Sequence, residues 1–394
     1  MMAKRIRTEM PKNMTDVSKN DSVNLSKSNS TEDRSNFIAD KSAYKNAYKN
    51  DLVKAAEKII IIDLLYLGDL LFTTPFIRNL RKNYPRARID MVVNANFSEI
   101  MEGNPYLDHI YPYNKGWSFL QSRQFARGLS KNNYDLGINL HGNWRTALLL
   151  KIINPAYSIG YGGKGRGIFL NREIKQTEGK HMVEAYLEDF SAVLGFTEID
   201  DRGMEIGVNE EAEKRMRNFL EDQGIKPGDR VVGLNTGGSW PTKRWTKEGF
   251  ARLADRLQRD YRVKVVFLGG PNDLSRVEEI RGMMETEPLI AAGKTGLKEL
   301  AALTKELDLV ISGDTGPVHV AASVGTPTIT IFGPSDEKRY APYGQNNHVI
   351  KLNLDCRPCG KHECPLGHYR CMTEITAEQI LKKCRLIFSS GGIN

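Results

Sequence analysis

A carboxylate that follows a buried strand is the first residue of this 394-residue chain that could do chemistry. The segment EKIIIIDLL at 57–65 has the aliphatic character of a buried parallel strand, and LGDLLFTTP then brings Asp69 to the start of a helix. The free N–H groups at a helix start carry roughly half a positive elementary charge, which favours a carboxylate there. Asp69 is therefore either a helix N-cap or a general base at a cleft, and position alone does not decide between them.

A glycine-rich loop at 235–245, NTGGSWPTKRW, has the composition of a diphosphate site. Thr236, Gly237 and Gly238 supply backbone N–H groups and a hydroxyl without crowding a ligand. Lys243 adds positive charge close by. The loop differs from the P-loop pattern, in which lysine directly follows glycine.

A third candidate loop, SGDTGPVHVAASVG at 312–325, turns from a strand into a helix that begins with proline. Proline at the first helical position leaves the N-terminal N–H groups free to meet an anion. Thr315 and Gly316 would then donate to a phosphate, and Asp314 would accept from sugar hydroxyls. His319, one turn into the helix, is either part of this site or a satisfied core histidine.

Two further signals are given no ligand-binding role. Gly160, Gly162 and Gly165 match the spacing G-x-G-x-x-G, but IFLNREI after them has the character of a strand, whereas the dinucleotide fingerprint requires a helix there. A nicotinamide cofactor is therefore not expected. Trp240 is interpreted as a packing residue.

Four cysteines form the last motif: Cys356, Cys359, Cys364 and Cys371, spaced C-x2-C-x4-C-x6-C. Four thiols within so short a segment of a reducing compartment suggest a structural zinc site. The spacing is not that of a standard zinc finger, so free thiols on a compact loop remain the alternative.

The elements that position these loops alternate between strand and helix, which predicts an α/β protein with parallel sheets. The alternation restarts after about residue 203. We therefore divide the chain into a polar, disordered extension at 1–56, an N-terminal Rossmann-like domain at 57–207, a C-terminal one at 208–375 that carries the cysteine loop at 356–371, and a final helix and tail at 376–394.

Composition restricts the class of protein. Hydrophobic residues make up 40% and charged residues 26%, as in ordinary globular proteins, and no apolar run approaches the ~20 residues that span a bilayer. The basic start leads into no apolar stretch, so we expect no secretory signal and a cytoplasmic location. The net charge of +8 favours an anionic partner, but the basic residues form no stripe interleaved with aromatics, so nucleic acid is not expected.

Together these loops resemble glycosyltransferase family 9, the ADP-heptose:lipopolysaccharide heptosyltransferases. The similarity runs from about residue 58 to the last helix and rests on LGDLLFTTPFIRNLRKNYP, EGNPYLDHIYPY, the glycine loop with KRW, FLGGPNDL and SGDTGPVHVAASVGTPTITIFGPSD. The cysteine segment is similar to that of the heptosyltransferase II branch. The resemblance implies a GT-B fold, in which two Rossmann-like domains face each other across a cleft, the C-terminal one binding the donor and the N-terminal one the acceptor.

The resemblance also implies an inverting transfer of heptose from an ADP-sugar to a lipopolysaccharide inner-core acceptor, with no cofactor required. The enzyme would work in the cytoplasm or as a peripheral protein on the inner membrane face. Asp69 takes the role of general base, and the donor pocket takes Thr236, Gly237, Gly238, Lys243, Asp314, Thr315, Gly316 and His319. One departure from the family pattern is the stretch between Thr236 and Lys243, which is longer than in some members. We assign Gly68, Thr73 and His181 to the acceptor side.

Two alternatives stay open. A transferase of the same family could use another nucleotide sugar or acceptor, and a nucleotide-sugar epimerase could share the two-domain shape. An epimerase would need donor-site residues but no acceptor cleft.

Overall fold

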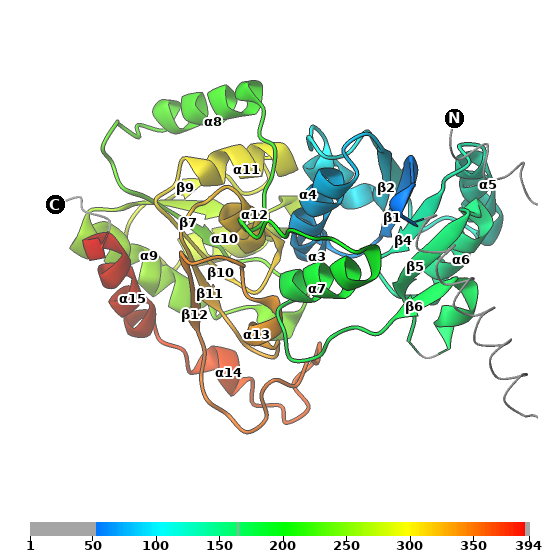
Figure 1. The fold of residues 1–394 in the computed structure, drawn as a ribbon. Helices are drawn as coiled ribbons and strands as arrows, with labels where there is room; N and C mark the ends of the chain where they lie inside the picture. Colours follow the sequence, from blue (N-terminus) through cyan, green and yellow to red (C-terminus); the bar gives the residue numbers. More distant parts are fainter. Residues whose placement is uncertain (1–52, 164, 391–394) are drawn as a thin grey trace, which may run out of the picture.

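The computed structural model describes residues 53–163 and 165–390, and it has two α/β halves that lie side by side (Figure 1). Most of the extension predicted at 1–56 falls outside the described residues. Val53 and Ala56 are already buried in the core, so the packed part of the chain begins before the expected boundary at residue 57.

The first half contains a six-stranded parallel sheet in the order β3-β2-β1-β4-β5-β6. Its central strand carries four consecutive isoleucines, 59–62, all fully buried, because helices cover both faces of the sheet. In register, Ile60 lies between Asp90 of β2 and Gly137 of β4. The strands are β1 (Lys58–Asp63), β2 (Arg88–Asn94), β3 (His109–Tyr113), β4 (Leu136–Asn139), β5 (Tyr157–Tyr161) and β6 (Arg172–Ile174).

The helices of this half follow the strands in the expected alternation. The segment predicted to be helical after β1 is divided at Thr73 into two helices. The helical elements are α3 (Leu67–Phe72), α4 (Thr74–Asn83), η2 (Ala95–Met101), α5 (Phe119–Ser130), α6 (Trp144–Ile153), η3 (Arg166–Phe169) and α7 (Met182–Leu194).

The second half repeats this topology with the order β12-β11-β10-β7-β8-β9. Its strands are β7 (Val231–Asn235), β8 (Lys264–Leu268), β9 (Leu289–Ile290), β10 (Leu309–Gly313), β11 (Thr328–Ile331) and β12 (Asn347–Ile350). Its helical elements are α8 (Glu210–Asp222), η4 (Pro241–Lys243), α9 (Lys247–Tyr261), η5 (Pro271–Asp273), α10 (Leu274–Arg281), α11 (Leu297–Lys305), α12 (Gly316–Ser323), α13 (Glu337–Tyr340), α14 (Arg370–Thr373) and α15 (Ala377–Ser390).

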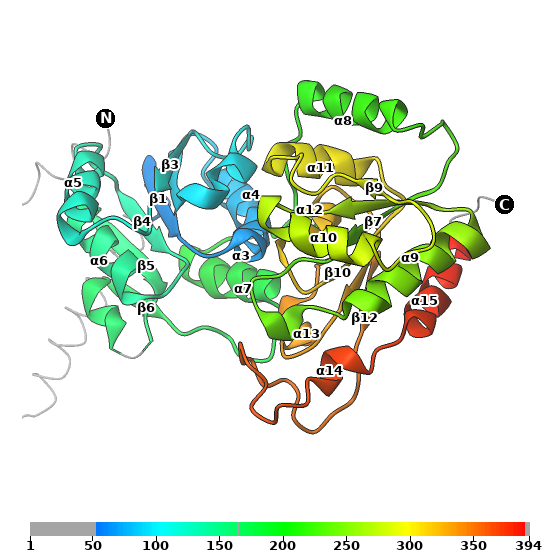
Figure 2. The same ribbon diagram turned by 180° about the vertical axis from the view of Figure 1, so that it is seen from behind.

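The last helix belongs to the second half. Figure 2 shows α15 beside α9, at the end of the molecule remote from the first half. The indole N–H of Trp245 donates to the carbonyl of Ile375 at 2.9 Å, and Cys384 of α15 is fully buried in the same cluster as Trp245. None of the helices within residues 53–163 and 165–390 is long and apolar enough to cross a bilayer.

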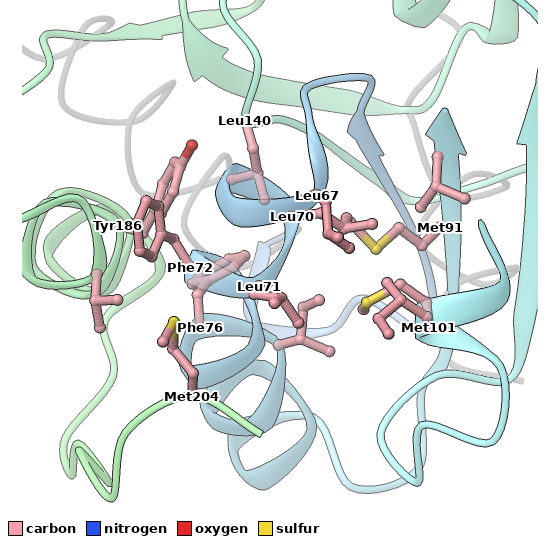
Figure 3. Packing of buried hydrophobic residues seen from close by; sticks show 14 of the residues in the cluster. Leu67, Leu70, Leu71, Phe72, Phe76, Met91, Met101, Leu140, Tyr186 and Met204 are labelled. Atoms are coloured by element: carbon pink, nitrogen blue, oxygen red, sulfur yellow. The ribbon is translucent and has the colours of Figure 1, made fainter. Parts of the chain in front are cut away.

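One buried cluster continues from the first half into the second through α3 and α12. Figure 3 shows Leu67, Leu70 and Leu71 of α3 on the side of Met91 and Met101, while Phe72 lies toward Tyr186 of α7. Helix α3, which carries Asp69, is therefore held from several directions by apolar contacts. Because so short a helix is not stable on its own, these packing contacts stabilise α3 and fix its position.

Candidate active site

The carboxyl edges of the two sheets border one cavity of about 960 Å³. In open parallel sheets ligands bind at this edge, beyond the strand ends. Nine of the residues predicted for the site line the cavity: Gly68, Asp69, Gly237, Gly238, Lys243, Asp314, Thr315, Gly316 and His319.

Two glycines let the halves approach each other at this cavity. A Cβ atom on Gly68 of α3 would lie 2.7 Å from Cδ2 of His319, and one on Gly316 of α12 would lie 2.7 Å from Cδ2 of Leu67. Neither distance is compatible with ordinary van der Waals contact. Each helix thus has a glycine among its first two residues, and a side chain of the other helix packs against it. This close packing brings Asp69 near the loop that follows β10.

Asp69 lies in the first turn of α3, whose N-cap is Tyr66, so the carboxylate is not the N-cap residue itself. Burial raises the pKa of Asp69, and His319, the Tyr66 backbone N–H and Lys243 lower it by smaller amounts. The net result is a pKa above the ordinary aspartate value. A carboxylate with a raised pKa is a stronger base, which is the property that proton abstraction requires.

Asp314 lines the same cavity, but its pKa is shifted in the opposite direction. Burial alone would raise its pKa, but His319 and the ammonium of Lys243 lower the pKa to about 2. Lys243 Nζ lies 2.6 Å from Asp314 Oδ2, and His319 Nε2 lies 3.7 Å from Oδ1. Asp314 is therefore a fixed negative charge that holds Lys243 in place at the cavity wall.

The loop after β10 is fixed by a side chain that the sequence analysis did not assign. Asn235, the last residue of β7, donates to the hydroxyls of Ser312 and Thr315 at 2.8 and 2.9 Å. The pair of hydrogen bonds orients Thr315 at the start of α12. The sequence signal that could have indicated Asn235 is its place at the end of β7, the strand that pairs with β10.

Trp240 was interpreted as a packing residue, and the structure corrects this. The side chain lines the cavity, its ring stacks on His362 with centroids 3.7 Å apart, and Lys243 Nζ lies 4.7 Å from the ring centroid. Trp240 thus holds its ring between His362 and the Lys243 ammonium at the cavity wall, where the cation is attracted to the aromatic ring. Other lining residues that the sequence did not reveal are Tyr66, Phe97, Asn272, Asp273, Ser335, Asp336 and Tyr340.

Three predicted residues lie outside the cavity lining. Thr73 is fully buried and its hydroxyl donates to the carbonyl of Leu70 at 2.7 Å, which ends α3. Thr236 is also buried; its hydroxyl has no hydrogen-bond partner among the described residues, and its carbonyl accepts from Arg276 at 3.0 Å. The loop therefore presents the glycines that follow Thr236 to the cavity, rather than Thr236 itself.

His181 is the third such residue, and it joins the two halves. Its Nδ1 accepts from the Val183 backbone N–H at 3.1 Å as the N-cap of α7. Its Nε2 therefore carries the proton and donates to the Ala341 carbonyl at 2.7 Å. Burial lowers the pKa of His181 to about 4, so the imidazole stays neutral in this structural role.

The four cysteines of the predicted zinc site line one small cavity together with His368 and Tyr369. All five cysteines of the chain are free thiols. Within residues 53–163 and 165–390, however, no group of three or more His, Cys, Asp and Glu side chains is placed to hold a metal ion. The spacing thus brings the thiols into one neighbourhood without arranging them as a ligand set, and the zinc assignment is not supported by this geometry.

Residues 122–370 match the model of glycosyltransferase family 9 (heptosyltransferase), which covers more than half of the chain. The protein belongs to this family and is a glycosyltransferase. Among curated relatives, lipopolysaccharide heptosyltransferase 3 of Escherichia coli K12 is 35% identical over 293 residues, covering 71% of this chain and 84% of that protein.

Solved structures give the same family and fold. The family 9 glycosyltransferase of Veillonella parvula aligns with a TM-score of 0.78 and 30% identity, covering 85% of this chain and 98% of that one. The ADP-heptose lipopolysaccharide heptosyltransferase II of E. coli aligns with a TM-score of 0.72 and 22% identity, covering 85% and 100%. The predicted GT-B architecture of two facing parallel sheets is confirmed.

Proposed function

We propose that this protein transfers heptose from ADP-heptose to an inner-core sugar of a lipopolysaccharide acceptor, with inversion at the anomeric carbon. The observation that carries the proposal is the meeting of Asp69 from one half with Lys243 and Asp314 from the other at a single cavity. The names of the relatives support the donor and the acceptor class.

Asp69 is the proposed general base. Its carboxylate takes the proton of the acceptor hydroxyl while that oxygen attacks the anomeric carbon and the bond to the diphosphate breaks. A positioned base of this kind typically contributes about 10²–10⁴-fold to the rate. Direct attack from the side opposite the leaving group is what inverts the anomeric configuration.

The second half is the proposed donor side. Lys243, held by Asp314, would meet the diphosphate and stabilise the negative charge that grows as ADP leaves. The backbone N–H groups at Gly237, Gly238 and the start of α12 would add hydrogen bonds, since helix N-termini favour anions. Trp240, stacked on His362, would border the adenine or sugar ring at the cavity wall.

The acceptor is proposed to be anionic and anchored in the cytoplasmic face of the inner membrane, which places the enzyme there as a peripheral protein. The basic net charge of +8 is compatible with such a partner.

A transfer assay tests the proposal. Purified protein is incubated with ADP-heptose and a deacylated heptose-containing core oligosaccharide, and the product is identified by mass spectrometry and its anomeric linkage by NMR. We expect a product one heptose heavier and stoichiometric ADP. Transfer from UDP- or GDP-sugars only would contradict the donor assignment, and ADP release independent of acceptor would contradict the transferase assignment.

A further inference from the structure

A cluster of exposed apolar side chains lies at the carboxyl edge of the first sheet, outside the active-site cavity. Ile168, Leu120, Phe119 and Trp144 expose 80%, 72%, 60% and 56% of their surface. Isolated exposed apolar residues are ordinary, but a group of large ones marks an interaction site. We call these four residues the apolar rim.

The topology places the rim residues together. Phe119 and Leu120 begin α5 after β3, Trp144 begins α6 after β4, and Ile168 lies in η3 after β5. Helices that follow parallel strands begin at the carboxyl edge, so all four lie at the same edge as the Asp69 loop that follows β1. Helix α5 packs on α6, and α6 packs on η3; Figures 1 and 2 both show α5 and α6 side by side.

Three cations accompany the rim. Arg145, next to Trp144, donates to the Lys115 carbonyl at 2.8 Å, and Arg166, two residues before Ile168, donates to the Gly142 carbonyl at 2.9 Å. These bonds fix the two arginine side chains beside the apolar residues. Lys115, Arg145 and Arg166 all act on His141, whose pKa is lowered to about 4 by burial and by these three charges. The three cations therefore share one neighbourhood.

The acidic groups nearby do not neutralise this face. Asp63, which interacts with Lys115, is buried beneath the loops with only 1% of its surface exposed. Glu173, beside η3, is exposed and accepts from the Gly163 backbone N–H at 2.7 Å, so it offsets one of the three cations. The exposed face thus keeps a net positive character around its apolar residues.

The rim is continuous with the active-site cavity. Tyr66 lines the cavity and packs against Phe97, and Lys115 Nζ lies 4.8 Å from the centre of the Tyr66 ring. Arg145 is bonded to the Lys115 backbone, so the path leads from the cavity to the rim within a few side chains. Whatever lies on the rim is close to the place where an acceptor would enter.

We propose that the apolar rim and its three cations form the surface by which this enzyme docks on an anionic lipid bilayer. Exposed Trp, Phe, Leu and Ile beside Arg and Lys are the composition that inserts into the headgroup region of acidic membranes. The charges complement anionic headgroups, and the adjoining cavity is then turned toward a membrane-anchored acceptor. This assignment rests on the proposed function for the identity of that acceptor, but its binding chemistry does not depend on it.

Vesicle sedimentation tests the docking surface, with the full chain and large unilamellar vesicles of phosphatidylcholine with or without phosphatidylglycerol. We expect binding to the anionic vesicles and much weaker binding to the neutral ones. Phe119→Ser/Leu120→Ser/Ile168→Ser should lower the partition coefficient at least roughly tenfold, because three apolar side chains lose their burial in the bilayer. Arg166→Gln should lower it about fivefold, the usual effect of one surface cation.

The matched control is Leu274→Ser/Met283→Ser, which removes two exposed apolar side chains of the second half, 41% and 47% exposed. It should bind vesicles as the unchanged protein does. Thermal melting checks the fold of each variant, and Arg166→Gln and Ile168→Ser alone keep the test valid if the triple variant unfolds.

Several outcomes would overturn the proposal. One is failure of the unchanged protein to bind anionic vesicles. Another is equal binding by the triple variant, which would also be the result if residues 1–52 carried the binding. A change from dimer to monomer in the triple variant without loss of vesicle binding would assign the rim to contact between copies of the chain instead. Transfer to the deacylated acceptor should be unaffected by the triple variant; absence of transfer in every protein would refute the proposed function and leave the vesicle result to stand.

Discussion

The two halves of this protein have the same topology, but each shifts the pKa of the carboxylate at its sheet edge in the opposite direction. In the first sheet the loop after the central strand β1 borders the cavity, and in the second sheet the loops after the central strands β7 and β10 do. Asp69 follows β1 and Asp314 follows β10. Burial dominates at Asp69 and raises its pKa, whereas at Asp314 His319, together with the Lys243 ammonium at 2.6 Å, outweighs burial and lowers the pKa to about 2.

This difference shows that a position in the fold does not assign a chemical role to a residue. The strand end brings a carboxylate to the cavity, and its neighbours then decide whether it can take a proton. Asp69 has the properties of a base, and Asp314 has those of a permanent charge that orients a cation. The four predictions below test that contrast, in order of decreasing effect.

Asp69→Asn should reduce the transfer rate about 10²–10⁴-fold, because the amide cannot accept the proton of the acceptor hydroxyl. Donor affinity, measured by calorimetry with ADP, should stay nearly the same, since the contacts proposed for the diphosphate come from the other half. The unchanged enzyme should also lose activity on acidification at a pH above the ordinary aspartate pKa of 3.8. Retention of more than about a tenth of the turnover by the variant would remove Asp69 from the role of base.

Lys243→Ala should act on binding and rate together. The dissociation constant for ADP should rise about ten- to a hundredfold, the range for a lost hydrogen bond to a charged group, and turnover should fall as well. The pKa of Asp314 should rise in the variant, because its nearest cation is gone. Lys247→Ala is the control, since Lys247 pairs with the exposed Glu279 away from the cavity. Equal effects of the two substitutions would show that Lys243 contributes only general charge.

The fold could be predicted from the sequence because the buried strands are visible as short aliphatic runs. Aliphatic runs such as 59–62 and the strand ending at Gly313 alternate with amphipathic helices, so both sheets and the loops at their edges followed from periodicity. The candidate residues in those loops were found for the same reason. Nine of the twelve residues predicted as general base, donor pocket or acceptor side line the cavity, and they come from the three loops that the sequence identified.

The features that the sequence did not reveal are of a different kind, because they depend on contacts between distant segments. Phe97 of the first half meets loops of the second half at the cavity, and Trp240 stacks on His362 from the distant cysteine segment, so no local sequence pattern indicates either placement. Thr236 shows that a loop can be predicted correctly while one of its residues is not, since Gly237 lines the cavity and the preceding Thr236 is buried outside the lining. The cysteine spacing likewise predicted proximity of the thiols but not their orientation.

Gly68→Ala should test whether the close approach of the halves matters to catalysis. The added methyl group would lie 2.7 Å from His319 Cδ2, so α3 or His319 must shift. We expect a loss of stability of roughly 1–3 kcal/mol and a lower turnover, as for other overpacked sites. Gly128→Ala in α5 is the matched control, because nothing lies within 4 Å of its new methyl group and alanine is the better helix former. A Gly68→Ala variant as stable and active as the control would show that the contact is loose.

Asp63 provides the most subtle test, since it lies near Asp69 but deeper in the first half. Its Oδ1 accepts from the Leu65 backbone N–H at 2.8 Å, its Oδ2 is buried without a partner, and burial raises its pKa to about 7. Because the pKa of Asp63 is raised in the folded state, its protonated carboxyl contributes its full stabilisation below about pH 4, where the carboxyl is also protonated in the unfolded chain. This contribution is lost progressively as the pH rises to about 7. Asp63→Asn keeps the acceptor for Leu65 but cannot ionise, so its melting temperature should vary less between pH 4 and 8 and should exceed that of the unchanged protein by a few degrees at pH 8. Differential scanning calorimetry across this range measures both curves, and parallel curves would show that Asp63 is paired or hydrated in solution.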